Sequence, residues 1–288
     1  MTTAKPLVSI LTPSFNQARW LNDNLRSVAL QTYDKVEHIV VDGGSTDGSV
    51  EILRTAPPHV QWTSEPDEGQ SAALNQAYQR SSGEIIGWLN SDDALFHRRV
   101  LERVVTWFDA RPEVDVIYGH AALVNDDGLL LHYLWTPRFR AERLLRFNFI
   151  SQPTVFMRRS SIGKQLADED FDYSMDRELW LRLSRSARFE RIGDVLAVDR
   201  HHPGRKSHVR IDLAREDRLR LARRYGAPPP EYRALRNRLT KIAIRFAGVA
   251  LIPRAVPELA FDGHLDGHAR LLVRQIAQFR SWMPSGSS

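Results

Sequence analysis

The 288-residue sequence contains no cysteine, which excludes both a disulfide framework and a thiolate metal site. It also contains no uninterrupted apolar run of about 18 residues, so no membrane-spanning helix is expected. The apolar segment from Leu7 to Thr12 is too short for the core of a signal peptide, and Pro13 follows it directly. Together with 42% hydrophobic and 26% charged residues, these absences predict a globular protein of the cytoplasm.

Glycine-rich phosphate-binding motifs are missing as well. Neither G-x-G-x-x-G nor G-x-x-x-x-G-K-[ST] occurs, so dinucleotide-binding and P-loop interpretations have no support. Charge is only weakly biased, with a formal net charge of +5, but arginine accumulates after Arg177. A basic C-terminal third can meet nucleic acid, an anionic membrane or a phosphorylated substrate, and it can equally form solvated helix faces.

Alternating strand and helix patterns fill the first 110 residues. Strand-like runs at 7–11, 36–41, 60–63 and 85–89 alternate with amphipathic helical segments at 21–29, 50–53, 70–80 and 100–108. Repeated strand–helix units with short connections predict an α/β fold, in which helices cover both faces of a mostly parallel sheet.

After Pro112 the pattern becomes mixed. Short strands are expected at 114–118, 121–124, 129–133, 154–157, 189–192 and 195–198, with a hairpin turn at 125–128. A helix is expected from Asp176 to Ser186, and the pattern from Ile211 onward predicts only helices. We therefore predict an α/β domain at 1–207, divided into halves 1–110 and 111–207, and a helical extension at 208–288.

Polar clusters follow the four predicted parallel strands. They are the segments 12–16, 42–45, 65–68 and 90–93. In open α/β sheets ligands bind at the carboxyl ends of the strands, so these clusters predict one shared site. The adjacent carboxylates of Asp92 and Asp93 suit a divalent cation with oxygen ligands. The alternative is a turn in which these residues cap the following helix.

Two later segments add candidates. Asp176 begins a predicted helix, where the helix dipole also favours an acidic residue without any catalytic role. His202 lies in a loop, where a neutral imidazole completes a metal site only if the loop folds over the strand ends. Arg200, Arg205 and Lys206 surround it, and they can contact phosphate oxygens or form ordinary surface charge.

With these motifs in order, the sequence resembles the family 2 glycosyltransferases of the GT-A fold. The resemblance runs from about Leu7 to Ser207. It rests on the segments 8–16, 40–48, 64–75, 87–93, 152–156, 175–183 and 202–207. It implies an inverting transfer of a sugar from a nucleotide-sugar donor to an acceptor hydroxyl.

Site residues follow from the resemblance by position. Asp176 matches the catalytic base, although Met175 stands where the family often has a second acid. Ser91 replaces the first acid of the D-x-D-type element, so Asp93 and His202 are left to bind Mg²⁺ or Mn²⁺. Trp180 and Arg182 would form the acceptor wall. Nucleotide-sugar binding falls to Thr12, Pro13, Ser14, Asn16, Asp42, Asp67, Gln70, Asn75, Ser91 and Asp92.

The resemblance further suggests bacterial surface-polysaccharide or lipopolysaccharide synthesis, with a saccharide or lipid-linked saccharide acceptor and no nucleic-acid partner. The basic helical C-terminus would then contact the inner face of the membrane peripherally. Two alternatives stay open at this point. One is a nucleotidyltransferase, although segment 12–16 lacks the glycine and basic residues such enzymes use. The other is a non-catalytic nucleotide-sugar-binding or assembly module.

Overall fold

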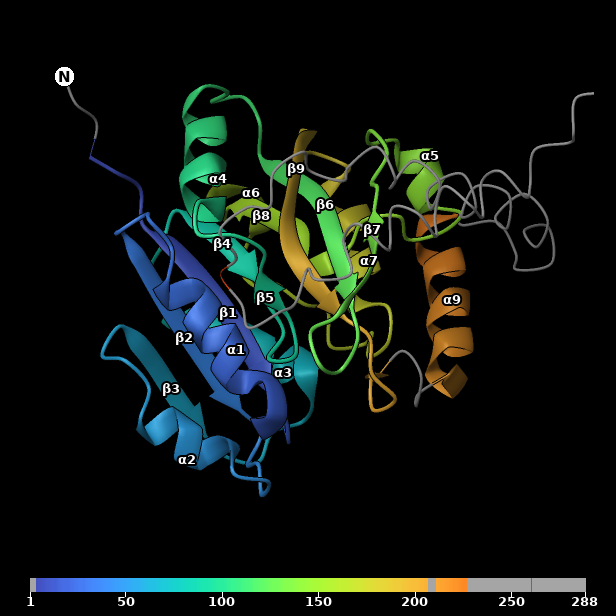
Figure 1. Cartoon of the computed structure of the whole chain (residues 1–288). Helices are drawn as coiled ribbons and strands as arrows, with labels where there is room; N and C mark the ends of the chain where they lie inside the picture. Colours follow the sequence, from blue (N-terminus) through green and yellow to red (C-terminus); the bar gives the residue numbers. More distant parts are fainter. Residues whose placement is uncertain (1–3, 207–210, 227–259, 261–288) are drawn as a thin grey trace, which may run out of the picture.

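A nine-stranded mixed β-sheet forms the centre of the computed structural model, which describes residues 4–206, 211–226 and 260 (Figure 1). The strand order is β3-β2-β1-β4-β8-β6-β9-β5, and β7 pairs with β6. The strands are β1 (Val8–Ser14), β2 (Val36–Asp42), β3 (Val60–Ser64), β4 (Ile85–Trp88), β5 (Ala94–Leu95), β6 (Val116–Val124), β7 (Leu130–Leu134), β8 (Val155–Arg158) and β9 (Phe189–Arg200). The helices are α1 (Ala18–Ala29), α2 (Ser49–Arg54), α3 (Gln70–Arg80), α4 (Val100–Asp109), α5 (Ala141–Leu144), the 3₁₀ helix η1 (Gln152–Thr154), α6 (Arg159–Ile162), α7 (Met175–Leu183) and α9 (Ile211–Tyr225).

Strands β1 to β4 are parallel, as the alternating sequence pattern predicts. Side chains of one strand point to opposite faces of the sheet, so each strand serves two apolar layers. Val8 and Ile10 of β1 pack with α1 and α4, whereas Leu11 packs with α3 and α7 on the other face. The predicted cover of helices on both faces is therefore confirmed, and the carboxyl ends of β1 to β4 meet at one rim.

The second half of the sheet mixes strand directions. β8 is antiparallel to β4 and β6, whereas β9 runs parallel to β6. The sequence predicts two short strands on either side of Gly119, but β6 continues through it with register shifts around His120. A Cβ atom at Gly119 would lie 2.5 Å from Cγ of Leu196, so this glycine allows β9 to approach closely. The two strands predicted around Gly193 likewise form one strand, β9.

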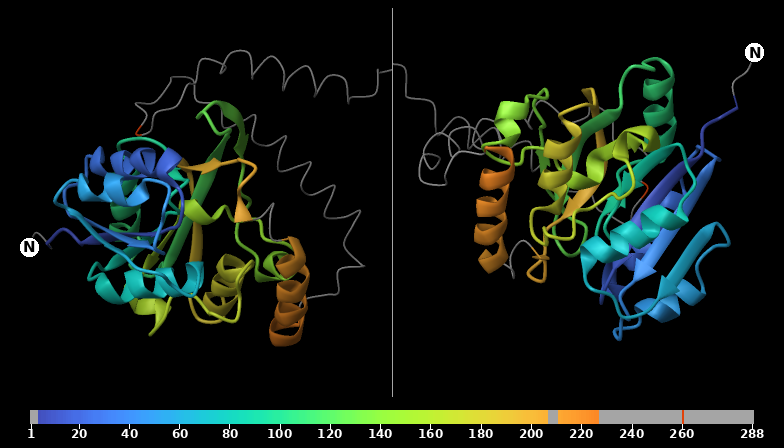
Figure 2. Two further views of the ribbon diagram at one scale, coloured as in Figure 1. Left: turned by 90° about the horizontal axis from the view of Figure 1, so that it is seen from below. Right: turned by 180° about the vertical axis from the view of Figure 1, so that it is seen from behind.

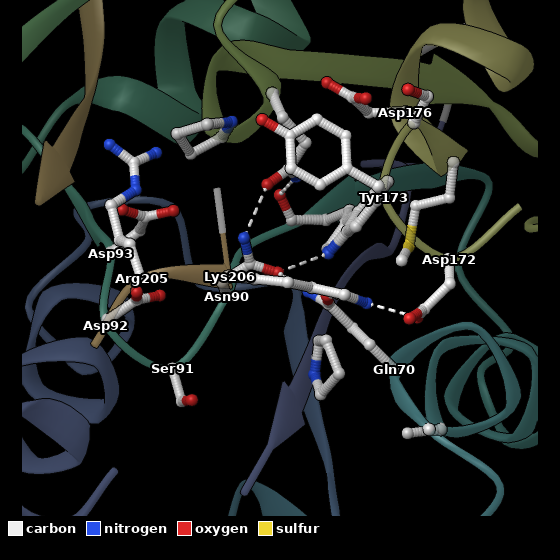
Figure 3. Close-up of a pocket in the computed structure, with 18 of the residues that line it drawn as sticks. Gln70, Asn90, Ser91, Asp92, Asp93, Asp172, Tyr173, Asp176, Arg205 and Lys206 are labelled. Atoms are coloured by element: carbon white, nitrogen blue, oxygen red, sulfur yellow. Dashed lines mark hydrogen bonds and ion pairs between the residues drawn. The ribbon is translucent and has the colours of Figure 1, made fainter. Parts of the chain in front are cut away.

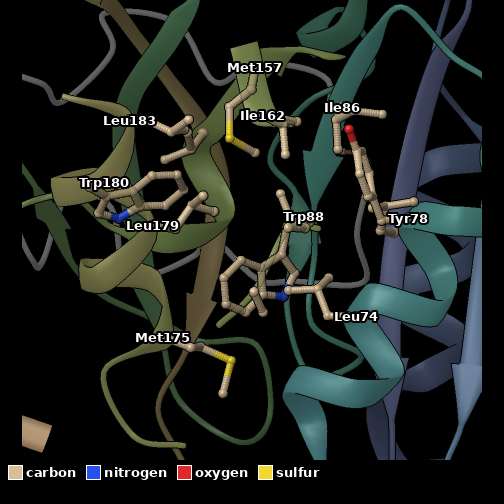
Figure 4. Packing of buried hydrophobic residues seen from close by; sticks show 14 of the residues in the cluster. Leu74, Tyr78, Ile86, Trp88, Met157, Ile162, Met175, Leu179, Trp180 and Leu183 are labelled. Carbon is tan, nitrogen blue, oxygen red and sulfur yellow. The ribbon is translucent and has the colours of Figure 1, made fainter. Parts of the chain in front are cut away.

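The largest apolar cluster lies between α3, the middle of the sheet and α7 (Figure 4). Leu74 and Tyr78 of α3 face Ile86 and Trp88 of β4, and Trp180 of α7 closes the cluster from the other side. This packing fixes the position of α7 relative to β4. It thereby also fixes the N-terminal end of α7 relative to the carboxyl end of β4.

Helix α9 stands at the opposite end of the molecule from β3 (Figure 2). Its residues, Ile211–Tyr225, fall within the segment that the sequence predicts to be helical. Most of the predicted helical extension, residues 227–259 and 261–288, lies outside the described residues. Within the part of the chain that the structure describes, no helix combines the length and apolar character needed to cross a bilayer.

Candidate active site

A cavity of about 1600 Å³ opens at the rim where β1, β2 and β4 end (Figure 3). The loop before α7 and the segment after β9 complete its walls, and both carry polar side chains from late in the sequence. Asp92 and Asp93 lie on one side of the view and Asp176 lies across from them. The strand-end clusters and the two later motifs are thus brought to one site, as the sequence predicts.

Neutral polar groups of four lining residues connect the elements around this cavity. The amide nitrogen of Gln70 and the indole N–H of Trp88 both donate to Oδ1 of Asn90, at 2.8 Å each. Nδ2 of Asn90 donates to Oε1 of Gln152 at 2.9 Å, and Nε2 of Gln152 donates to the carbonyl of Trp88 at 2.6 Å. This amide network, formed by Gln70, Trp88, Asn90 and Gln152, ties α3, β4 and η1 together.

Asp92 contacts His202 in the loop that follows β9. Its Oδ2 lies 2.9 Å from Nε2 of His202, and its carboxylate lines the cavity. His202 is 3% exposed and its ring lies against Trp20, with ring centroids 4.0 Å apart. The loop after β9 therefore folds over the strand end, as a functional His202 requires, and the buried His202 lies behind Asp92 rather than in the cavity lining.

Asp93 has a different environment. It is 4% exposed, and its Oδ1 accepts the backbone N–H of Arg200 at 3.0 Å. Burial, together with the neighbouring carboxylates of Asp92 and Asp199, raises the pKa of Asp93 well above the ordinary 3.8. Asp93, which the sequence assigns to the metal, thus lines the cavity and also anchors the end of β9, while Asp92 lies against His202.

Asp176 lies in the first turn of α7 and lines the cavity. Its carboxylate accepts the side-chain amide of Asn148 at 2.5 Å and the backbone N–H of Arg177 at 2.6 Å. Burial raises the pKa of Asp176 above the ordinary 3.8, because the ionised form loses hydration. A carboxylate with this environment is suited to accept a proton.

Arg205 and Lys206 supply positive charge to the cavity wall. Arg205 pairs with Asp199 at 2.7 Å, and Lys206 pairs with Asp172 at 2.5 Å. Arg200 instead is 2% exposed and donates to the carbonyl of Asp92 at 2.9 Å, so it supports the fold of the loop.

The predicted nucleotide-sugar residues divide into two groups. The cavity is lined by Pro13, Ser14, Asp67, Gln70, Ser91 and Asp92. Of the remaining members, Thr12, Asp42 and Asn75 are buried outside the lining, and Asn16 is exposed and accepts the N–H of Thr46.

The contacts of this second group explain its position. Asp42 accepts hydrogen bonds from the backbone and hydroxyl of Ser45 and from the hydroxyl of Ser64, so it joins the loops after β2 and β3. Asn75 bonds the backbone of Leu166 and Ala167 and thereby fixes the segment that precedes α7. Their direct contact with a nucleotide stays a prediction.

Trp180 and Arg182 do not line the cavity, in contrast to the acceptor wall that the sequence predicts. Trp180 is fully buried in the apolar cluster. Arg182 donates to the carbonyl of Leu166 at 2.6 Å and to Glu178 at 3.3 Å. The cavity meets only the N-terminal end of α7, and four residues later the helix has risen about 6 Å into the core.

A truncation of Trp180 is therefore expected to act on stability. We expect Trp180→Ala to lower the free energy of unfolding by about 3–5 kcal/mol, because it leaves a large cavity in the core. Urea denaturation followed by circular dichroism measures this loss, with Trp180→Phe as the control that retains most of the packing. Wild-type stability of Trp180→Ala would contradict the core assignment.

Several lining residues carry no role in the sequence prediction, and three of them are notable. Phe15 lines the cavity although 60% of its surface is exposed, and Asn90 and Gln152 form the amide network. The available signals were positional: Phe15 follows the first strand, and Asn90 directly precedes Ser91.

This sheet order, with a polar cavity at the carboxyl ends of its parallel strands, is the GT-A-like α/β fold of glycosyltransferases. Residues 9–166, more than half of the chain, match the family described as glycosyl transferase family 2. The chain belongs to this family and is a glycosyltransferase. This result favours sugar transfer over the nucleotidyl transfer and non-catalytic binding that the sequence leaves open.

Similar proteins in mycobacteria are also named as glycosyltransferases. The PGL/p-HBAD biosynthesis glycosyltransferase of Mycobacterium bovis (strain BCG / Pasteur 1173P2) is 27% identical over 236 residues, covering 77% of this chain and 88% of the relative. An uncharacterized glycosyltransferase of Mycobacterium tuberculosis is 29% identical over 201 residues, covering 62% of this chain and 70% of the relative.

Two solved structures show a similar fold. S. aureus TarS 1-349 in complex with UDP has a TM-score of 0.58 at 16% identity, covering 97% of this chain and 73% of that chain. The mannosyltransferase PcManGT from Pyrobaculum calidifontis in complex with GDP-Man and Mn²⁺ has a TM-score of 0.59 at 21% identity, covering 97% and 84%. At these identities the likeness concerns the fold alone.

Proposed function

We propose that this glycosyltransferase inverts the anomeric centre as it moves a sugar from a nucleoside diphosphate to an acceptor hydroxyl. The observation that carries the proposal is the placement of Asp92 and Asp176 across one cavity. Inversion by a single displacement needs the base and the leaving group on opposite sides of the sugar. The Asp92 side would hold the diphosphate, and Asp176 would face the acceptor.

A divalent cation fits beside Asp92. Among the described residues, no group of three or more histidine and acidic side chains is arranged to hold a metal ion. Mg²⁺, however, is commonly bound by one or two protein ligands together with substrate phosphates. Asp92 Oδ2 and His202 Nε2 lie 2.9 Å apart as hydrogen-bond partners, so one carboxylate oxygen and one imidazole nitrogen are already side by side.

We therefore propose that Asp92 and His202 would hold Mg²⁺ or Mn²⁺, whereas Asp93, which also lines the cavity, is engaged with the N–H of Arg200. The bound ion would supply positive charge that stabilises the departing diphosphate. Arg205 and Lys206 line the same cavity and are suited to contact phosphate oxygens.

We propose that Asp176 accepts the proton of the acceptor hydroxyl. As the acceptor oxygen forms its bond to the anomeric carbon, its hydroxyl proton passes to the Asp176 carboxylate, and the bond to the diphosphate oxygen breaks. The amide of Asn148 holds this carboxylate in one orientation. The raised pKa of Asp176 makes it a stronger base than an exposed aspartate.

Phe15 is suited to stack on the nucleotide base, because an exposed phenyl ring lines the cavity at the end of β1. Stacking of a base on an aromatic ring contributes about 1–3 kcal/mol. We expect Phe15→Ala to raise the donor KM about tenfold and to leave kcat within about twofold. Leu129→Ala is the matched control, because Leu129 is 41% exposed and lies outside the cavity lining. An unchanged KM in Phe15→Ala would contradict the stacking role.

The biological setting we propose is bacterial surface-polysaccharide or lipopolysaccharide synthesis, with a saccharide or lipid-linked saccharide acceptor. One relative is named a PGL/p-HBAD biosynthesis glycosyltransferase, which supports a role in a biosynthetic route. The enzyme would work in the cytoplasm, where the arginine-rich α9 and the chain after it would contact the inner membrane surface.

A thermal-shift screen of UDP-, GDP- and dTDP-sugars, with and without Mn²⁺, tests the proposed donor class. A donor present at about 100 times its Kd stabilises the fold by about 2.7 kcal/mol. We expect one nucleotide class to raise the melting temperature by several degrees and Mn²⁺ to increase the shift. Absence of a shift with all three nucleotide classes would overturn the proposal.

A further inference from the structure

Helix α9 reaches the start of α7 through one buried carboxylate. Asp217 is 3% exposed. Its Oδ2 accepts the backbone N–H of Tyr173 at 2.8 Å and that of Ser174 at 2.6 Å. Burial raises the pKa of Asp217, whereas the two backbone hydrogen bonds act to lower it.

Ser174 is the residue that precedes α7, and it makes no side-chain capping hydrogen bond of its own. The unpaired N–H groups at a helix start are usually bonded by a side chain within a few residues. Here an acceptor comes from a carboxylate 43 residues further along the chain. Asp176 is two residues after Ser174, so this distant contact holds the backbone directly before the proposed base.

Other contacts join α9 to the segment around α7. The hydroxyl of Tyr225 donates to Oε1 of the fully buried Glu178 at 2.6 Å. Arg224 pairs with Asp168, and Leu221 is buried in the apolar cluster. Asp217 lies at the end of α9 nearer the cavity, where the helix also contributes Ala214 and Arg218 to the lining.

We propose that Asp217 is a positioning residue, which sets the orientation of the Asp176 carboxylate by fixing the backbone at the start of α7. The inference rests on the proposed role of Asp176 as base. It makes α9 part of the catalytic unit, although the family match ends at residue 166. Misplacement of a catalytic group by about 1 Å lowers the rate about 100-fold.

The test is a double-mutant cycle between Asp217 and Asp176. The assay measures nucleoside diphosphate release, in the presence of Mn²⁺, from the UDP-, GDP- or dTDP-sugar that gives the largest thermal shift. We expect Asp217→Ala to lower kcat about 10- to 100-fold in the wild-type background, with the donor KM within about twofold. In the Asp176→Asn background the same change is expected to lower kcat less than about threefold, because the group it positions is already lost.

Asp217→Asn keeps one carbonyl acceptor, so it is expected to recover about half of the logarithmic loss in kcat. It also provides a folded variant if Asp217→Ala unfolds. Glu216→Ala is the matched control, because Glu216 is an exposed neighbour on α9 and is expected to keep wild-type kcat.

Equal losses of kcat from Asp217→Ala in both backgrounds would overturn the proposal, because the residue would then act on the fold in general. Wild-type kcat in Asp217→Ala would also overturn it. Wild-type kcat in Asp176→Asn alone would refute the base assignment instead, so the two failures are distinguishable.

Discussion

Asp176→Asn is expected to lower kcat about 1000-fold while the donor still binds. Positioned general bases typically contribute 10²–10⁴-fold, and the amide of asparagine cannot accept the acceptor proton at neutral pH. The variant keeps Oδ1 for the N–H of Arg177, and Asn148 can reverse its amide to match. The rate at which nucleoside diphosphate is produced at saturating donor measures the loss of kcat.

The pH dependence provides an independent readout of the same residue. Because burial raises the pKa of Asp176 above 3.8, wild-type kcat is expected to fall on the acidic side at a pH above that value. In the folded protein a raised pKa means that stability decreases as pH rises through the interval between the ordinary and raised values. Asp176→Asn is therefore expected to melt no lower than the wild type at neutral pH.

Asp170→Asn is the control for Asp176→Asn, since it removes an exposed carboxylate from the same segment outside the main cavity. A variant Asp176→Asn with near-wild-type kcat and an unchanged acidic limb would remove Asp176 from the mechanism.

Removal of the metal or of the Asp92 carboxylate should produce the second large effect. We expect Asp92→Ala and EDTA each to lower kcat at least about 100-fold, because charge stabilisation by a bound cation is worth several kcal/mol. The concentration of Mn²⁺ that gives half of the thermal shift should rise about 10- to 100-fold in Asp92→Ala and in His202→Ala.

Asp93→Asn distinguishes the two adjacent acids. Asp93 accepts the N–H of Arg200 and is nearly fully buried, so its loss is expected to lower the melting temperature and leave the Mn²⁺ dependence unchanged. If Asp93→Asn abolished the Mn²⁺ effect while Asp92→Ala kept it, the original assignment of Asp93 to the metal would be restored. Full activity of the wild type in EDTA would exclude the cation altogether.

Local periodicity was sufficient for the first half of the fold. Helix α3 begins and ends at Gln70 and Arg80, as predicted, because its apolar residues recur at helical spacing and buried contacts follow that stripe. The breaks predicted at Gly119 and Gly193 were wrong, since each glycine lies within a strand. At Gly119 the close approach of Leu196 is a contact between distant segments, which no local pattern contains.

In the site, too, local sequence predicts some positions, and others depend on contacts between distant segments. Strand ends place Ser14, Gln70 and Asp92 at the rim because parallel strands share one direction. The sequence order does not reveal how deep Trp180 lies, because that depends on where the cavity meets α7. The support from Asp217 was equally inaccessible, since it comes from a helix that joins the site only after folding.

The amide network around the cavity has a consequence for experiments. None of the four groups that Gln70, Trp88, Asn90 and Gln152 contribute changes its protonation state between about pH 4 and pH 10. Their mutual hydrogen bonds therefore persist while the neighbouring carboxylates titrate. A pH–rate profile of this enzyme should accordingly report the ionisation of its acidic side chains, without a contribution from a change in the hydrogen bonds of the amide network.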